Sequence, residues 1–427
     1  MLVEFTVGNY LSFRKDATLS LVGTRLTSEN SALDEGAFRR VSADLSVLHT
    51  AVIYGANGSG KSNLILALGF MLRFIQDSGR AGQSDDLIPV VPFLFDEDSR
   101  EEPSYFELVF LRDGVQYRYG FEADQYAVRK EWLYRKNKRE TLLFERRGQE
   151  FPVLKGEFKD TRLITENTRK EALFLSVCAQ LNSKYAQGLL EHLRTKVVVL
   201  GEGHIGHSFT AECVDDGRYH GKILELLRGF DLGVSDFKTE LQRIAPANLP
   251  IELPEEIRKD LEGRKVWDVT TVHPKFDHTG TVIGYQELSL RAESAGTQKL
   301  FAFAGPLVDI LEKGIAVVID EFDVALHPLI SQKIIGLFHD PEVNQHGAQL
   351  IIATHDTNLI HRRILRRDEI WFVEKSGEGA SSLYSLASFR PRKDASLGRD
   401  YFRGKFGAIP FLGGLDLLSW GEEANEL

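Results

Sequence analysis

Cysteines and long hydrophobic runs are scarce in this sequence. Only two of the 427 residues are cysteines, Cys178 and Cys213, and no Cys-x-x-Cys pair occurs. This scarcity argues against a disulfide framework and against a structural zinc site. No apolar run is long enough to cross a bilayer, and the first residues lack the charged and apolar regions of a signal peptide. We therefore expect a cytoplasmic protein without membrane contact.

An excess of positive charge is also missing. The chain carries 52 Lys and Arg residues against 62 Asp and Glu residues, a formal net charge of -10. A protein of this charge is not expected to coat nucleic acid as a whole, although local basic clusters can bind a polyanion. These clusters are solvated faces, a DNA groove in a dimer, or a docking face for an acidic partner. They are Arg129-Lys130, Arg135–Arg139, Arg362-Arg363, Arg366-Arg367 and Arg390–Lys393.

The pattern of apolar residues divides the chain into three parts. Residues 1–150 contain alternating strand-like runs, and Asp113-Gly114 predicts a hairpin turn between two of them. Residues 151–280 have mostly helical periodicity, and residues 281–427 return to strand–helix alternation. A chain of this length exceeds a single hydrophobic core. We therefore predict an α/β fold with a mixed or parallel sheet and an N-terminal antiparallel β subdomain, interrupted by a mostly helical insertion.

A glycine-rich loop follows a predicted strand at 51–54 and precedes a predicted apolar helix. Residues 55–62 match the phosphate-binding pattern G-x-x-x-x-G-K-[ST] at every fixed position. Glycines let backbone N–H groups converge on an anion, and the helix N-terminus adds positive partial charge. A chance glycine-rich turn is the weaker alternative. We predict that Lys61 contacts the β- and γ-phosphates, that Ser62 binds Mg²⁺, and that nucleotide is bound by Gly55, Ala56, Asn57, Gly58, Ser59, Gly60, Lys61, Ser62 and Asn63.

Two adjacent carboxylates end an apolar run near residue 320. Residues 316–319 read Ala-Val-Val-Ile and are followed by Asp320 and Glu321. In phosphate-loop enzymes the first acid at such a strand end belongs to the Mg²⁺ shell, and a second can polarise the attacking water. A buried strand with ordinary capping acids is the alternative. We assign Asp320 to the metal and Glu321 to catalysis.

A second apolar strand is predicted to end just before Thr354 and His355. A histidine beside the acid pair can contact the γ-phosphate and sense its loss, whereas a lone histidine elsewhere is commonly a loop or core residue. We assign His355 to catalysis together with Glu321 and Lys61. ATP is favoured over GTP because the guanine-like run at residues 137–140 precedes the acid pair and lies in a basic neighbourhood.

Residues 294–298, Ser-Ala-Gly-Thr-Gln, lie between the nucleotide motifs at the start of a predicted helix. With those motifs they resemble the ABC-type ATPase superfamily, in particular its RecF, SMC and OLD-nuclease branch, whose signature commonly reads L-S-G-G-Q. Ser294 and Gly296 match that form, whereas Glu293 and Ala295 depart from it. Thr297 stands at its last position, unless Gln298 substitutes for the final glutamine. The resemblance implies that Ser294, Gly296 and Thr297 bind the γ-phosphate of an ATP held by a second molecule. A head-to-tail dimer or higher homo-oligomer is then expected around two Mg-ATP.

Three further segments resemble a narrower group. The runs FTVGNYLSFRK, SYFELVF and GRDYFRGKFGAIP resemble the AbiLi/RloA-type ATPases, which include the AriA subunit of PARIS. This resemblance implies a role in bacterial anti-phage defence. It also implies a separately encoded effector, which is a TOPRIM-like or RloB-type nuclease or another toxin. The ATPase would then be the sensor and scaffold that controls this effector.

Two alternatives remain open from the sequence. A RecF-like repair ATPase would act directly on DNA and would bind it in a salt-sensitive manner. A self-contained nuclease would cleave with metal and no partner, although no nuclease motif is visible in the chain. Both alternatives keep the nucleotide site and differ only in what it controls.

Overall fold

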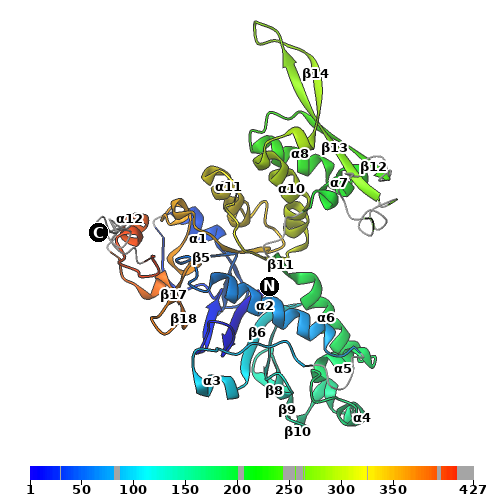
Figure 1. The fold of residues 1–427 in the computed structure, drawn as a ribbon, viewed down its shortest axis with the longest axis vertical. Helices are drawn as coiled ribbons and strands as arrows, with labels where there is room; N and C mark the ends of the chain where they lie inside the picture. Colours follow the sequence, from blue (N-terminus) through cyan, green and yellow to red (C-terminus); the bar gives the residue numbers. More distant parts are fainter. Residues whose placement is uncertain are drawn as a thin grey trace, which may run out of the picture.

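A six-stranded sheet forms the centre of the molecule, a computed structural model shown in Figure 1. The structure describes residues 1–28, 30–80, 87–200, 206–243, 255, 263, 265–324, 326–391 and 396–410. The strand order is β11-β15-β16-β5-β17-β18. The first five strands are parallel and β18 is antiparallel. The strands are β11 (Val197–Leu200), β15 (Ala316–Ile319), β16 (Gln349–Ala353), β5 (Thr50–Tyr54), β17 (Ile370–Lys375) and β18 (Ser381–Ser385).

The central sheet separates two hydrophobic cores. In β5, Ala51 and Ile53 face one core while Val52 and Tyr54 face the other, as expected for side chains that alternate along a strand. Strands buried on both faces are apolar throughout, which explains the uninterrupted runs of β15 and β16. Helix α2 (Lys61–Asp77) belongs to the first core, and α10 (Ala295–Lys313) and α11 (Pro328–His339) belong to the second.

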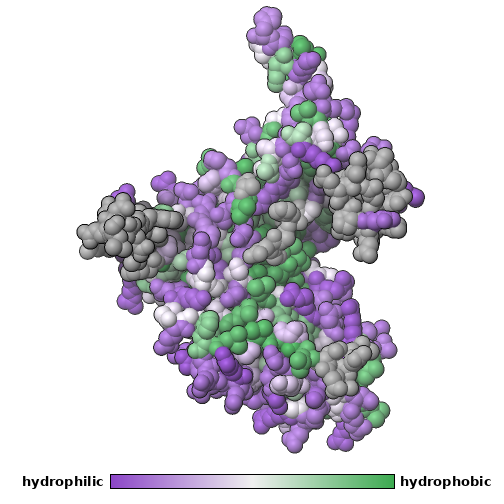
Figure 2. Space-filling model, viewed as in Figure 1, coloured by the Kyte–Doolittle hydropathy of each residue, from purple (hydrophilic) through white to green (hydrophobic). Residues whose placement is uncertain are grey.

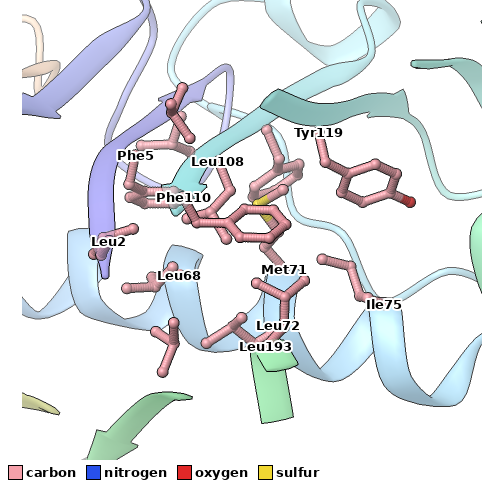
Figure 3. Packing of buried hydrophobic residues seen from close by; sticks show 14 of the residues in the cluster. Leu2, Phe5, Leu68, Met71, Leu72, Ile75, Leu108, Phe110, Tyr119 and Leu193 are labelled. Carbon is pink, nitrogen blue, oxygen red and sulfur yellow. The ribbon is translucent and has the colours of Figure 1, made fainter. Parts of the chain in front are cut away.

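A seven-stranded antiparallel sheet completes the first core and confirms the predicted antiparallel subdomain. Its order is β10-β9-β8-β7-β6-β1-β2. Asp113 and Gly114 join β6 to β7 with φ angles of 52° and 77°, which confirms the predicted turn. Figure 3 shows side chains of α2 packed against β1 and β6. The strands are β1 (Leu2–Gly8), β2 (Ala17–Ser20), β6 (Ser104–Arg112), β7 (Val115–Ala123), β8 (Val128–Lys136), β9 (Glu140–Arg147) and β10 (Glu150–Leu154).

Residues 151–280 contain more strand than their helical periodicity indicated. Strand β11 enters the central sheet, and β12 (Asp236–Arg243), β13 (Lys265–Phe276) and β14 (Val282–Ser289) form a separate antiparallel sheet. Figure 1 shows the β13–β14 hairpin projecting from the upper lobe. One reason the pattern was missed is that β12 is exposed along most of its length, so no apolar alternation marks it, whereas β14 lies beyond residue 280, where strands were expected. The helices here are α4 (Arg162–Glu166), α5 (Phe174–Gln180), α6 (Lys184–Lys196), α7 (Ser208–Asp215) and α8 (His220–Gly229).

The remaining elements are short. They are α1 (Ser31–Gly36), β3 (Phe38–Arg40), β4 (Ser46–Leu48), α3 (Glu97–Glu101) and α12 (Leu397–Phe402). No helix within the described ranges is long and apolar enough to span a membrane. Figure 2 shows hydrophilic residues over most of the visible face, with hydrophobic ones gathered near its middle. The observed architecture is a mixed α/β fold, as predicted, whereas domain boundaries at residues 150 and 280 remain a prediction.

Candidate nucleotide-binding site

The predicted phosphate-binding loop connects β5 to α2. Gly58 and Gly60 have φ angles of 73° and 113°, a region that side-chain-bearing residues rarely adopt. A Cβ at Gly55 would lie 2.4 Å from the carbonyl oxygen of Val373, and one at Gly60 would lie 2.3 Å from Oγ of Ser381. Backbone conformation and space therefore require glycine at the positions that the motif fixes.

Lys61 begins α2 and folds back over the loop. Its Nζ donates to the carbonyl oxygens of Gly55 at 2.8 Å and Ala56 at 3.2 Å, and its side chain is buried. Burial lowers the pKa of Lys61, while the nearby carboxylates of Asp320 and Asp323 act in the opposite direction. The ammonium group thus lies between the loop and the acids, where it can exchange neutral carbonyl partners for phosphate oxygens.

The loop rests on a small network of hydroxyl groups. Ser381 Oγ donates to the carbonyl oxygen of Ser59 at 2.5 Å and to Ser12 Oγ at 2.8 Å. Asn63 Nδ2 donates to the same Ser12 oxygen at 2.7 Å. Segments from the beginning of the chain and from β18 therefore meet directly beneath the glycines. These hydrogen bonds connect the loop to two other segments of the chain.

The acid pair lies at the carboxyl end of β15. Strands β15, β16 and β5 are parallel neighbours in register, so the residues after each strand reach the same edge of the sheet. Asp320 is buried, and its Oδ1 accepts the backbone N–H of Glu321 at 3.0 Å. Glu321 has a φ of 48°, a conformation uncommon for a non-glycine residue. Its side chain is exposed at the sheet edge, where a bound phosphate would be accessible.

His355 lies one strand away and is positioned by Asp323. Oδ1 of Asp323 accepts the hydroxyl of Thr354 at 2.6 Å and the backbone N–H of His355 at 3.3 Å. Partial burial lowers the pKa of His355, and the cation of Lys61 lowers it further, against the carboxylates nearby. The imidazole is therefore expected to be neutral near pH 7, able to accept or donate one hydrogen bond.

The oxygen groups around the loop fit a magnesium ion that arrives with a nucleotide. No group of three or more His, Cys, Asp or Glu side chains that could hold a metal occurs among the described residues. Mg²⁺ in nucleotide sites needs only one or two protein oxygens because phosphates and water supply the others. The Ser62 hydroxyl and the Asp320 carboxylate are of the required chemical type, and they flank the loop from α2 and β15.

The turn at Ser294 begins α10 in the other half of the molecule. Ser294 Oγ accepts the backbone N–H of Thr297 at 3.1 Å and lies 2.9 Å from its hydroxyl, which is a helix N-cap. Ser294 is exposed, and Gly296 is partly exposed. Behind the turn, Oε1 of Glu293 contacts Thr271 Oγ1 and His273 Nε2, both at 2.6 Å. Glu293, which replaces the leucine of the usual signature, thus anchors the turn to β13.

Three of the five predicted basic clusters contain a cation that forms an ion pair with an acid. Arg129 pairs with Asp124 at 2.5 Å and Lys130 with Glu122 at 2.9 Å. Arg366 is buried and pairs with Asp368 at 3.0 Å, so it is not a surface charge. Arg392 and Lys393 lie outside the described residues. The guanine-like run at 137–140 forms the β8–β9 turn and the first residue of β9 in the antiparallel sheet, rather than a strand end beside the phosphate loop.

Four residues near the site had no assigned role from the sequence. Asp323 was recognisable only as part of the run after the acid pair. Ser12 and Ser381 carry no local signal, because Ser381 lies 322 positions from the loop carbonyl that it supports. Lys299 donates from α10 to carbonyl oxygens of the loop after Glu321. Only the three-dimensional arrangement brings these side chains to the nucleotide motifs.

Comparison with known families gives one match that covers both halves of the site. The model described as "AAA domain, putative AbiEii toxin, Type IV TA system" matches residues 51–170 and 229–361, together more than half of the chain. The matched ranges contain the phosphate loop, the turn at Ser294, the acid pair and His355. No curated protein sequence matches the chain significantly.

Solved structures give weaker similarities. An SMC head domain from Thermotoga maritima aligns with a TM-score of 0.40 and 15% identity, over 90% of this chain and 98% of that one. An Smc head domain from Pyrococcus furiosus, bound to the C-terminal domain of ScpA, gives 0.35 and 15%, over 90% and 96%. The recombination mediator RecF with ATP gives 0.31 and 15%, over 90% and 99%. The fold assigned above rests on its own strand order rather than on these scores.

Proposed function

Because the chain belongs to the family of AAA domains described as putative AbiEii toxins of type IV toxin–antitoxin systems, we propose that it is an ABC-type ATPase. It binds ATP with Mg²⁺ and hydrolyses it to ADP and phosphate. The observation that carries this proposal is the convergence of Lys61, Asp320, Glu321 and His355 on one edge of the parallel sheet. These residues follow the ends of three strands, β5, β15 and β16, that lie apart in the sequence.

Each residue has a role that its position supports. Lys61 and the loop N–H groups bind the β- and γ-phosphates, and Ser62 and Asp320 would hold the Mg²⁺ ion. Glu321 orients a water molecule whose oxygen attacks the γ-phosphorus, while the bond to the bridging β–γ oxygen breaks and ADP leaves. His355, neutral near pH 7, hydrogen-bonds a γ-phosphate oxygen. Catalysis then consists of positioning and charge stabilisation.

Two subunits are needed for the complete site in this proposal. The turn at Ser294 exposes a serine and a helix N-terminus, which together suit an anion supplied from outside the subunit. A head-to-tail dimer would place each turn over the ATP of the other subunit, and larger assemblies of such dimers are compatible with it.

The biological role that we propose is control of a separate toxic effector in anti-phage defence. The family description, with its reference to a toxin, supports a defence context. Direct action on DNA in the manner of a RecF-like repair ATPase is the second candidate. The ion pairs of Arg129 and Lys130 disfavour it, since an arginine or lysine paired to an acid offers less net charge to a phosphate backbone.

The test of this proposal is the mass of the particle in solution, measured by light scattering with and without Mg-ATP. Wild type and Glu321→Gln are compared, with Glu342→Gln as a control that neutralises an exposed acid away from the site. Glu321→Gln is expected to assemble with ATP and to stay assembled because it cannot hydrolyse it. Wild type and the control should assemble and then return as ATP is consumed. A particle whose mass ignores ATP in all three proteins would contradict the model.

A further inference from the structure

One lysine links the helix behind the Ser294 turn to the loop that carries Glu321. Lys299 lies in the second turn of α10, and its Nζ donates to the carbonyl oxygens of Phe322, at 3.3 Å, and Val324. These two carbonyls belong to the first and third residues after Glu321 in the chain. The signature turn and the loop after Glu321 of the same subunit are therefore joined by the Lys299 side chain, beside a ring contact between Phe303 and Phe322.

The loop that Lys299 contacts has an unusual conformation. Glu321 is in the left-handed region, and the loop is closed by a backbone hydrogen bond from Val324 N to Glu321 O at 3.2 Å. On its other side, Phe322 N–H donates to Ala353 O of β16 at 3.1 Å. A left-handed non-glycine residue persists only when surrounding contacts enforce it. Lys299 supplies two of those contacts.

The side chain of Lys299 is partly shielded from solvent and hydrogen-bonded to the loop. It is partly buried, and burial lowers its pKa while the carboxylates of Asp323 and Glu321 favour its charged form. Nζ is thus a cation placed between backbone carbonyls and the acids that follow β15. A neutral side chain at this position would leave both carbonyls without their charged donor, and such hydrogen bonds are stronger than neutral ones.

Lys299 is also close to the Ser294 turn along α10. A helix rises about 1.5 Å per residue, so Lys299 lies about 7–8 Å along α10 from Ser294. Thr297, between them, is buried, and Gln298 Nε2 donates to the carbonyl of Glu293 at 2.8 Å. The turn and the first part of α10 are therefore tied together, and a displacement of Ser294 also displaces Lys299.

We propose that Lys299 is a positioning residue that couples the two ATP sites of the assembly. The idea rests on the proposed function, in which the Ser294 turn of one subunit closes over the nucleotide of the other. When that turn is occupied, Lys299 holds the loop of its own subunit with Glu321 directed at its own ATP. Hydrolysis in each site then depends on occupancy of the other.

The test is steady-state ATP hydrolysis by Lys299→Met, measured over a range of ATP concentrations. Wild type is expected to respond cooperatively, with a Hill coefficient well above 1, and the variant to respond with a coefficient of about 1. The turnover number should fall about tenfold, while equilibrium binding of a fluorescent ATP analogue changes less than about twofold. Lys313→Met, on the same helix, removes a lysine that pairs with Asp309 and serves as the matched control.

Lys299→Arg keeps the cation and is expected to restore part of the cooperativity, which a role in packing alone would not predict. Thermal unfolding of each variant separates loss of coupling from loss of fold. The inference is overturned if wild type hydrolyses ATP without cooperativity, or if Lys299→Met retains the wild-type Hill coefficient and turnover. If wild type neither binds nor hydrolyses ATP, the proposed function itself fails.

Discussion

The phosphate loop and the Ser294 turn use the same chemistry in different surroundings. Both place a serine hydroxyl at the N-terminus of a long apolar helix, where backbone N–H groups face outward. The loop is enclosed: Ser59 and Lys61 are buried, and Ser12 and Ser381 support it from below. Ser294 is exposed, and its hydroxyl is hydrogen-bonded to Thr297 of its own helix.

Under the proposed function, this difference predicts which half of the anion site needs a partner. A loop supported on several sides is pre-organised, so it can bind phosphate within one subunit. A lone cap at the surface offers one hydroxyl and a helix end, and it gains full binding strength only when another surface excludes water around it. The following predictions test this contrast, beginning with the largest expected effect.

Lys61→Met should abolish ATP hydrolysis by altering the enclosed phosphate loop. The change removes the cation between the loop and the acids, and we expect the kcat/KM of ATP hydrolysis to fall about 10³-fold or more, about 4 kcal/mol of transition-state stabilisation. Binding of labelled ATP and hydrolysis are the measurements, with Lys313→Met again as the control. Hydrolysis near the wild-type rate would show that the loop is not the phosphate site.

The sequence was sufficient to predict the enclosed half. Its motif is contiguous, so Gly55, Gly60 and Lys61 could be identified without any knowledge of the fold, and the strand and helix around them followed from apolar periodicity. The acid pair could be predicted equally well, because β15 is apolar throughout and ends directly before Asp320. The observed order of β5, β15 and β16 places these residues at one edge, as the parallel-sheet prediction required.

The contacts that support the site could not be predicted in the same way. Ser381 and Ser12 meet only because β18 and the N-terminal strands converge beneath the loop, a tertiary event without a local signal. Strands β12 and β13 were not predicted either, and the anchoring of Glu293 to β13 was missed with them. A residue that departs from a family motif, as Glu293 does, is explained by its neighbours rather than by the motif.

Removal of Mg²⁺ should separate binding from turnover. With a chelator present we expect ATP to bind more weakly to the loop, while hydrolysis falls at least about 10²-fold because the developing phosphate charge loses its main counter-charge. Equilibrium binding and phosphate release, each with and without EDTA, are the measurements. Hydrolysis that continues without divalent ions would exclude the roles assigned to Ser62 and Asp320.

Ser294→Arg should affect only the exposed half. A bulky cation at the cap would obstruct a facing subunit, so ATP-driven assembly is expected to weaken about 10- to 100-fold, whereas ATP binding by the separated subunit stays unchanged. Light scattering and nucleotide titration measure the two effects. Ser42→Arg, an equally exposed serine in the other lobe, controls for added charge. Equal loss of binding and assembly would mean that the two halves are not independent.

Thr271→Val should give the smallest effect, since it alters the support behind the turn and one contact of the same hydroxyl with the carbonyl oxygen of Leu288. The change removes the hydroxyl that donates to Glu293 at 2.6 Å, while the contact from His273 remains. We expect a loss of about 1 kcal/mol in the free energy of unfolding and a fall of a few-fold in turnover, with ATP binding to the loop unaffected. Thr270→Val, the preceding residue on the opposite face of β13, is the matched control. If both substitutions slow turnover equally, the hydrogen bond to Glu293 does not position the turn, and the exposed half depends on its partner subunit alone.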